Sequence, residues 1–150
     1  MQSEIDAKDQ NTAKLFCDFI NTLKQLRGPQ GCKWDKAQTH ETLIKCLQEE
    51  SGEVITAIQN KDDENLQEEL GDLLLQVVFH AAIAEEQNRF TLADVIDGVN
   101  QKLIRRHPHV FGDAKASTPE EALAQWKEIK KQEKLLKAQK AQKAQNAAQK

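Results

Sequence analysis

Two short acidic segments with helical spacing constrain the fold of this chain more than any other feature of its sequence. They are Glu49–Glu53, which reads Glu-Glu-Ser-Gly-Glu, and Glu69–Asp72, which reads Glu-Leu-Gly-Asp. Each segment places two carboxylates three residues apart, and residues at that spacing share one face of a helix. These pairs are Glu50 with Glu53 and Glu69 with Asp72. The polar stretch between the segments, Asn60–Asp63, suits a tight turn between antiparallel helices, so all four carboxylates should converge.

Carboxylates that converge repel one another, and burying even one ionised carboxylate costs free energy unless a cation lies beside it. An all-oxygen ligand set suits a hard ion, Mg²⁺ or Mn²⁺, rather than zinc. Glu50 supports this interpretation because it falls on the apolar stripe of its own helix, among Leu43, Leu47, Val54 and Ile58. The sequence therefore predicts a divalent-metal site between two helices.

Two glycines, Gly52 and Gly71, lie in the middle of these helices, between the acidic residues. Each costs roughly 1 kcal/mol relative to alanine, so we expect a helix or a ligand to approach closely there. The alternative interpretation of the whole pattern is an ordinary, solvated, glutamate-rich helix surface. It is the better interpretation for five other glutamates taken singly, namely Glu41, Glu64, Glu68, Glu85 and Glu86.

The length of 150 residues suits one domain. Three cysteines without Cys-x-x-Cys spacing argue against a disulfide framework and a structural zinc site, and fit a reducing compartment. The sequence shows no secretory leader and no run of about eighteen apolar residues, so we expect a soluble, cytoplasmic protein without a membrane partner. From Lys127 onward lie 8 of the 21 basic residues but only 2 of the 24 acidic ones, so the body is acidic and the tail basic.

Apolar residues recur at helical spacing and no segment alternates as a strand does, so the predicted fold is all-α with a four-helix bundle core. The helices are expected from Asn11 or Thr12 to Gly28, at about 40–59 after a Thr39 cap, at about 64–88, at about 91–106, and from Thr118 onward. A loop is expected at Gly28–Gln38. The third helix is apolar nearly all round and should be the most buried.

The domain organisation follows from the same pattern. We expect residues 1–10 to be disordered, residues 11–133 to form the helical domain, and residues 134–150 to form a low-complexity tail rich in Lys, Gln and Ala. The tail's lysines have no aromatic residues between them and the body is acidic, so nucleic-acid binding is disfavoured.

A basic cluster of Lys102, Arg105 and Arg106 ends the fourth expected helix, just before Pro108. The helix dipole favours cations at this end, which would be a purely structural explanation. The functional alternative is a phosphate clamp, since the three side chains lie within about one turn and the arginine fork matches phosphate oxygens. An acidic metal site and a basic cluster in one small domain indicate a metal–polyphosphate ligand.

Four further side chains have both a structural and a functional interpretation. His107 and His109 flank a proline without a Cys or Glu at metal-binding spacing, so packing or surface roles are favoured. Trp34, in a polar loop, and Trp126, on an amphipathic helix, could belong to the core or could stack on a nucleobase. Other chemistries lack their motifs, since there is no Glu-x-x-His pair and no Walker phosphate loop.

Together these motifs resemble those of the MazG family of all-α nucleoside triphosphate pyrophosphohydrolases. The two acidic segments match its EExxE…ExxD signature. Further stretches resemble its GCPWD-x-x-QT loop and two other family blocks, namely Gly31–Lys36 with Gln38 and Thr39, Glu69–Phe79, and Lys102–Phe111. The resemblance runs from about Leu26 to Ile129.

The resemblance implies hydrolysis of a (d)NTP to the monophosphate and pyrophosphate with Mg²⁺ or Mn²⁺, for nucleotide housecleaning or pool control, in a homodimer or larger homo-oligomer. By motif position it implies four metal ligands, Glu50, Glu53, Glu69 and Asp72. Glu49 would act with Glu50 and Glu53 in catalysis, by orienting water or serving as the base. The substrate-binding residues would be Lys102, Arg105 and Arg106 at the phosphates and Trp126, with Trp34, at the base.

Two features depart from the family pattern. Lys33 stands where the family usually has proline, and the chain carries one such domain, which resembles the N-terminal copy of two-domain members. The alternative to an enzyme is therefore a catalytically weak helical module that binds or senses nucleotides or mediates an interaction. The preferred base and sugar do not follow from the sequence.

Overall fold

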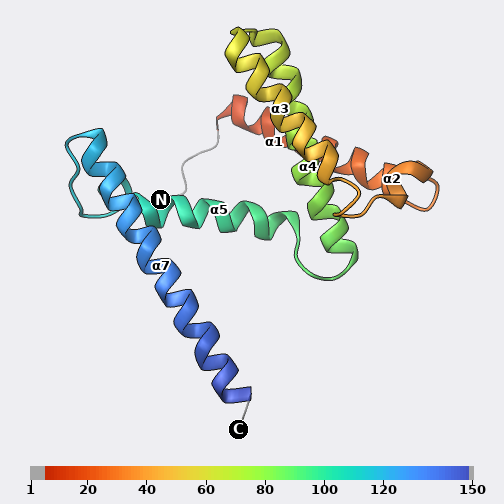
Figure 1. Cartoon of the computed structure of the whole chain (residues 1–150). Helices are drawn as coiled ribbons and strands as arrows, with labels where there is room; N and C mark the ends of the chain where they lie inside the picture. Colours follow the sequence, from red (N-terminus) through yellow and green to blue (C-terminus); the bar gives the residue numbers. More distant parts are fainter. Residues whose placement is uncertain (1–5, 149–150) are drawn as a thin grey trace. The chain divides into compact units, whose positions relative to one another are not determined.

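The computed structural model describes residues 6–148, and all the regular secondary structure in that range is helical (Figure 1). The all-α prediction is therefore confirmed. The helices are α1 (Ala7–Arg27), α2 (Lys33–Ala37), α3 (Ile44–Asn60), α4 (Asp63–Glu86), α5 (Leu92–Arg106), α6 (Pro108–Phe111) and α7 (Pro119–Ala148). The chain divides into two compact units between Leu92 and Ala93, and each unit is described separately below.

Helix α1 begins earlier than the sequence analysis predicted. Asp6 is its N-cap, and the side chain of Asp6 accepts a hydrogen bond from the backbone N–H of Asp9 at 2.9 Å. The expected start at residue 11 or 12 is therefore wrong, since an aspartate cap five residues upstream already satisfies the free N–H groups of the first turn. The expected disorder of residues 1–10 falls partly on residues 1–5, which lie outside the described residues.

The segment between α1 and α3 also differs from the prediction. The expected loop contains the short helix α2, and α3 begins at Ile44 rather than near residue 40. Thr39 does cap a turn, because its hydroxyl accepts from the backbone N–H of Thr42 at 3.3 Å while the Thr42 hydroxyl accepts from the Thr39 N–H at 2.8 Å. This reciprocal pair closes a separate turn and delays the helix.

The turn between α3 and α4 is short, as predicted. Lys61 takes a left-handed conformation (φ 56°) at the end of α3, and Asp62 then caps α4 by accepting from the N–H of Asn65 at 3.1 Å. Two helices joined in this way must run antiparallel side by side, as α3 and α4 do in Figure 1. The acidic segment of each helix therefore faces that of the other.

Helix α4 supplies most of the core of the first unit, as its apolar composition predicted. Its buried residues are Gln76, Val78, Phe79, Ala81, Ile83 and Ala84. Among them, Val78, Phe79 and Ile83 pack with Leu23 of α1 and with Leu43, which are 2% and 1% exposed. Other apolar positions are less covered, and Cys17 of α1 is exposed.

A buried arginine ties three helices of the first unit together. The side chain of Arg27, at the end of α1, is 6% exposed. It forms a bidentate ion pair with Glu86 of α4, in which both N···O distances are 2.7 Å. Its guanidinium also donates to the backbone carbonyl of Asp35 in α2 and lies 5.1 Å from the centre of the Phe79 ring. Every partner of Arg27 thus fixes the position of α2 or α4 relative to α1.

Two histidines connect the turn before α3 to α4. His40 and His80 stack with ring centroids 5.1 Å apart and share a hydrogen bond between their Nδ1 atoms at 2.7 Å. Partial burial, followed by the charge of His40, lowers the pKa of His80. A hydrogen bond between the two Nδ1 atoms requires that one ring donate and the other accept, so the two rings cannot both carry a proton at Nδ1.

In the second unit, α7 begins with a capping box at Thr118, the residue where the sequence predicted a helix to start. The hydroxyl of Thr118 accepts from the backbone N–H of Glu121 at 3.2 Å, and the carboxylate of Glu121 accepts from the N–H of Ser117 at 2.6 Å. Helix α7 then continues to Ala148, through the stretch expected to be a low-complexity tail, whose side chains are exposed up to Asn146. The proposed domain limit at residue 133 stays a prediction.

We expect Arg27→Met to lower the free energy of unfolding by about 2–3 kcal/mol, because Glu86 and the Asp35 carbonyl lose their buried donor. Equilibrium urea denaturation followed by circular dichroism measures this change. Glu86→Gln is the matched control and should cost less, since Glu86 is half exposed and can be solvated. Equal, small losses in both variants would contradict a structural role for Arg27.

Candidate functional site: an acidic cluster and a basic cluster

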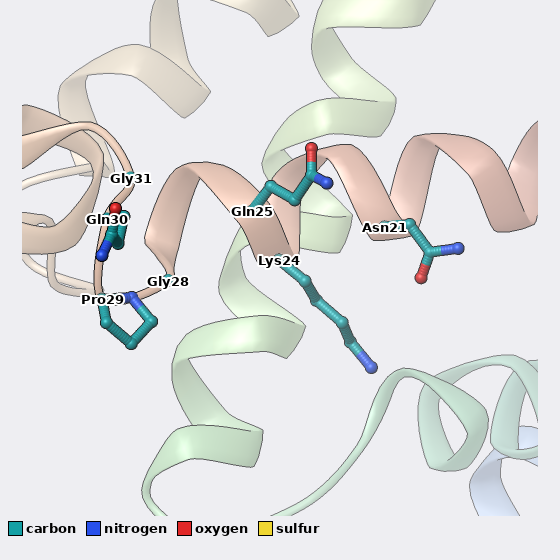
Figure 2. Close-up of a pocket in the computed structure, with 7 residues that line it drawn as sticks. All are labelled: Asn21, Lys24, Gln25, Gly28, Pro29, Gln30 and Gly31. Carbon is teal, nitrogen blue, oxygen red and sulfur yellow. The ribbon is translucent and has the colours of Figure 1, made fainter.

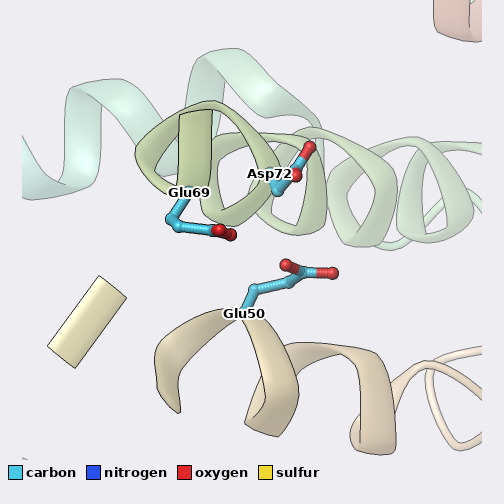
Figure 3. Close-up of side chains that lie close together, drawn as sticks. All are labelled: Glu50, Glu69 and Asp72. Atoms are coloured by element: carbon cyan, nitrogen blue, oxygen red, sulfur yellow. The ribbon is translucent and has the colours of Figure 1, made fainter. Parts of the chain in front are cut away.

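Three predicted metal ligands converge between α3 and α4. Glu50 of α3 and the residues Glu69 and Asp72 of α4 each offer a carboxylate oxygen, and these oxygens all lie within 4.8 Å of one another. Figure 3 shows the carboxylates of Glu50 and Glu69 in the space between the two helices, with Asp72 next to them on α4. We refer to these residues as the acidic cluster. Among the described residues, no other group of three or more His, Cys, Asp or Glu side chains is placed to share a metal ion.

Glu53, the fourth predicted ligand, lies beside the acidic cluster. Partial burial raises the pKa of Glu50, and the charges of Asp72 and Glu53 raise it further. Partial burial also raises the pKa of Glu69, with the charge of Glu53 and a hydrogen bond to it as the next causes. The ionised forms of these carboxylates therefore repel one another, as the sequence analysis expected.

Glu49, expected to orient water or act as a base, points elsewhere. Its carboxylate pairs with the ammonium of Lys45 one turn earlier, at 3.4 Å, and both side chains are largely exposed. It adds a smaller charge effect to the raised pKa of Glu50. In this structure Glu49 is a neighbour of the acidic cluster and not a member of it.

The donor chemistry of the acidic cluster fits a divalent cation. All its ligand atoms are carboxylate oxygens, which Mg²⁺ and Mn²⁺ prefer. The crowded carboxyls of Glu50 and Glu69 have raised pKa values, and no ion pair among the described residues compensates them. A bound cation would supply that positive charge.

Gly52 and Gly71, which lie between the acidic residues, do not serve the close helix approach expected of them. A Cβ atom at Gly52 or at Gly71 would meet no atom within 4 Å, so the packing of α3 on α4 requires neither glycine. A close approach within the chain does occur at Gly31, where a Cβ would lie 2.1 Å from the carbonyl oxygen of Leu26. Gly31 is therefore the glycine on which the α1–α2 connection depends.

The predicted phosphate clamp lies in the second unit, and its arginines already have an anionic partner. Arg105 donates from Nε to one carboxylate oxygen of Glu133 at 2.6 Å. Arg106 donates from Nε and Nη2 to the other oxygen at 3.0 and 2.6 Å. These bonds lower the pKa of Glu133 to about 2. Lys102 is exposed.

The two tryptophans have different surroundings. Trp126 of α7 lies against two cations, with the guanidinium carbon of Arg106 at 5.1 Å and Nζ of Lys130 at 4.8 Å from its ring centre. It also lines a pocket of about 290 Å³ with His107, Ala122 and Leu123. Trp34 is 59% exposed on α2, so it is not a core residue. The sequence analysis missed Glu133 and Lys130 as parts of this arrangement.

A pocket of the first unit at the end of α1 does not contain a predicted site residue. It measures about 1040 Å³ and surrounds the end of α1 and the following turn, lined by Asn21, Lys24, Gln25, Gly28, Pro29, Gln30 and Gly31 (Figure 2). Lys24 is its one charged side chain, so it lacks the ligands for a metal–phosphate group. The acidic cluster is the better candidate site.

Comparison with known proteins identifies the family. The family described as "MazG nucleotide pyrophosphohydrolase domain" matches residues 38–111. The crystal structure of a mazG-related protein from Thermotoga maritima is similar at a TM-score of 0.63 and 34% sequence identity, over 79% of this chain and 98% of that one. This all-α chain, with its acidic cluster between two antiparallel helices, belongs to the MazG family.

Longer relatives carry more specific names. The "Nucleoside triphosphate pyrophosphohydrolase/pyrophosphatase MazG" of Thermotoga maritima is 54% identical over 120 residues, which cover 80% of this chain and 46% of that protein. The "Nucleoside triphosphate pyrophosphohydrolase" of Escherichia coli K12 is 45% identical, over 79% of this chain and 46% of that protein. The chain thus spans about half the length of these relatives. No helix in its described part is long and apolar enough to cross a membrane.

We expect Glu69→Gln to weaken Mn²⁺ binding about tenfold or more, because a charged ligand of the acidic cluster becomes neutral. The measurement is the rise in thermal midpoint with Mn²⁺ concentration. Glu68→Gln is the control, since Glu68 is exposed and lies one residue away on α4, off the shared face. Equal responses in both variants would argue against metal binding at the acidic cluster.

The metal-free protein should also show a pH dependence from Glu69. Its folded pKa is raised above the ordinary 4.5, so the folded state binds its proton more readily than the unfolded state. Stability in EDTA should therefore rise as the pH falls from neutral toward 4.5, and Glu69→Gln should lack part of this rise. Thermal unfolding of both proteins across this pH range tests the sign.

Proposed function

We propose that this chain is a Mg²⁺-dependent nucleoside triphosphate pyrophosphohydrolase that converts a (d)NTP and water into a (d)NMP and pyrophosphate. The observation that carries the proposal is the convergence of Glu50, Glu69 and Asp72 within 4.8 Å, in a chain of the MazG family. The names of the Thermotoga maritima and Escherichia coli relatives support the same reaction. Mn²⁺ has the same ligand preference and should substitute.

In this proposal the acidic cluster and Glu53 hold the cations. A bound divalent cation would supply Lewis-acid chemistry, neutralising phosphate oxygens and lowering the pKa of water. Glu53 interacts with both Glu50 and Glu69, so it links the ligand from α3 to those from α4. Glu49 would orient the attacking water only after leaving Lys45, which an exposed pair does at little cost.

The phosphates of the nucleotide would be bound by Lys102, Arg105 and Arg106. Positive charge from these side chains would stabilise the leaving pyrophosphate. Trp126 and Trp34 are the proposed contacts for the base. Since Arg106 and Lys130 already lie against Trp126, a base would meet that ring only at a position they leave open.

We also propose that the chain forms a homodimer or a larger homo-oligomer. An apolar groove of about 340 Å³ runs between α1 and α4, lined by Thr12, Leu15, Phe16, Phe19, Gly71 and Leu74. Leu15 and Leu74 in this groove are 58% and 42% exposed, so both side chains are available for contact with another molecule. Gly71, next to Asp72, would let a second copy approach. Free cysteines at positions 17, 32 and 46 support a reducing compartment, and we propose the cytoplasm.

The reaction is tested by product analysis with a panel of NTPs and dNTPs, in Mg²⁺ and in EDTA. We expect Mg²⁺-dependent monophosphate and pyrophosphate, and a loss of at least about a hundredfold in kcat in Glu50→Gln and in Glu53→Gln. Glu68→Gln should retain activity. Diphosphate with phosphate would show that a different bond is cleaved. Metal-dependent nucleotide binding without turnover would favour the alternative, a binding or sensing module.

The oligomer is tested by sedimentation velocity at micromolar concentration. The wild type should sediment as a dimer or larger, and the double variant Leu15→Gln, Leu74→Gln should dissociate at least about tenfold more readily, because buried apolar area is lost. Leu135→Gln, at an exposed position on α7, is the control. A monomeric wild type would contradict the proposal.

A further inference from the structure

The arginines of the proposed phosphate clamp are not equivalent in this structure. The side chain of Arg106 is 14% exposed, and it uses two nitrogens on Glu133 while lying against the ring of Trp126. The side chain of Arg105 is 54% exposed and uses Nε alone. Its Nη1 and Nη2 groups have no hydrogen-bond partner among the described residues. Arg106 is therefore held inside the unit, whereas Arg105 keeps free donors at the surface.

Glu133 lies between the two arginines and bonds each with a different oxygen. Its carboxylate is 17% exposed, and two of its three bonds measure 2.6 Å, as charge-assisted bonds do. A phosphate that displaced Glu133 would leave a carboxylate without its partners next to a second anion, which is unfavourable. A phosphate that bound the outer edge of Arg105 would leave all three bonds in place.

The total charge allows such an additional anion. Two arginines and one glutamate leave one net positive charge, and Lys130 adds another at the ring of Trp126. An internal carboxylate therefore fixes the geometry of the arginines without removing the positive charge. This arrangement is preorganisation, in which the donors are oriented before the ligand arrives.

We propose that Glu133 is a positioning residue, which holds Arg105 so that its outer nitrogens bind a phosphate group of the substrate while Arg106 anchors Glu133. The inference rests on the proposed function for the identity of the ligand, a pyrophosphate-containing nucleotide. It revises the role proposed above for Arg106: Glu133 acts only through Arg105, and Arg106 anchors Glu133 and does not itself contact the phosphate.

Binding of inorganic pyrophosphate in the presence of Mg²⁺, measured by calorimetry on the full chain, tests this inference without requiring turnover. Glu133→Gln should weaken binding about tenfold, because the amide cannot accept from both arginines. Arg105→Met should weaken it by a similar or larger factor. In the double variant, Glu133→Gln should have no further effect, since the residue through which it acts is gone.

The controls separate positioning from other causes. Glu128→Gln removes a negative charge from α7 without touching either arginine, and it should leave binding unchanged or slightly tighter. Arg105 is exposed, so Arg105→Met should fold normally, and circular dichroism checks each variant. In active protein, Glu133→Gln should raise KM for the nucleotide with a smaller change in kcat.

Three outcomes would overturn the inference, and they differ from those that would overturn the proposed function. The first is that the effects of Glu133→Gln and Arg105→Met multiply, which indicates independent roles. The second is tighter pyrophosphate binding in Glu133→Gln, which means that Glu133 competes with phosphate. The third is that the wild type does not bind pyrophosphate. Suppose that the protein shows no turnover, and that Glu133→Gln weakens pyrophosphate binding only when Arg105 is present. This result would support the positioning role and reject the hydrolase function.

Discussion

The pairing of α3 with α4 is the constraint on which the rest of the first unit depends. The two helices are joined by a turn that needs a left-handed Lys61 and an Asp62 cap, and this turn sets the register at which Glu50 meets Glu69 and Asp72. At Glu50 and Glu69, partial burial and repulsion from neighbouring carboxylates oppose the pairing and raise the pKa of both carboxyls. Burial of apolar side chains further along α4, and the ties from Arg27 and His80, hold the helices together. The metal-free fold thus maintains an unfavourable cluster that a cation would relieve.

The second unit contains a cluster of crowded positive charges, the opposite sign from the acidic cluster. Its arginines are also crowded, but Glu133 lies between them, and the pKa of this carboxylate falls to about 2. One cluster therefore has uncompensated negative charge, whereas in the other an internal carboxylate offsets one of the two arginine charges. The difference matches the expected ligands, since a hard divalent cation is bound through anionic oxygen ligands, whose negative charge it compensates. A phosphate group is bound well by a few oriented donors at a surface.

Features that depend on neighbouring residues could be predicted from the sequence. The shared faces of Glu50 with Glu53 and of Glu69 with Asp72, the Asp62 cap and the Thr118 capping box all follow from helix geometry. Features that depend on distant partners could not. Arg27 meets Glu86 across 59 residues, and nothing near either residue indicates the pair. The predicted start of α3 was wrong for a local reason, because Thr39 and Thr42 hydrogen-bond to each other and close a turn.

Glu133 was missed although a signal for it exists. Ala122, Trp126, Ile129 and Glu133 are all partly buried and recur at helical spacing, so Glu133 falls on the covered stripe of α7. This is the same signal that identified Glu50 on the stripe of α3. A carboxylate at such a position needs a cationic partner, and in the structure Arg105 and Arg106 supply it from 28 and 27 residues away.

The departure at Lys33 has a structural explanation. Lys33 is the first residue of α2, following the Cys32 cap. Proline is favoured at this position of a helix, because a backbone N–H there would have no partner within the helix. The fixed φ of proline also suits the first turn. Lysine meets the same backbone requirement and loses only the rigidity of proline, worth about 0.4–1 kcal/mol. The connection is also held independently, by Gly31 against the α1 carbonyls and by Arg27 on Asp35. The substitution therefore adds a positive charge next to Trp34 without requiring a different path for the chain.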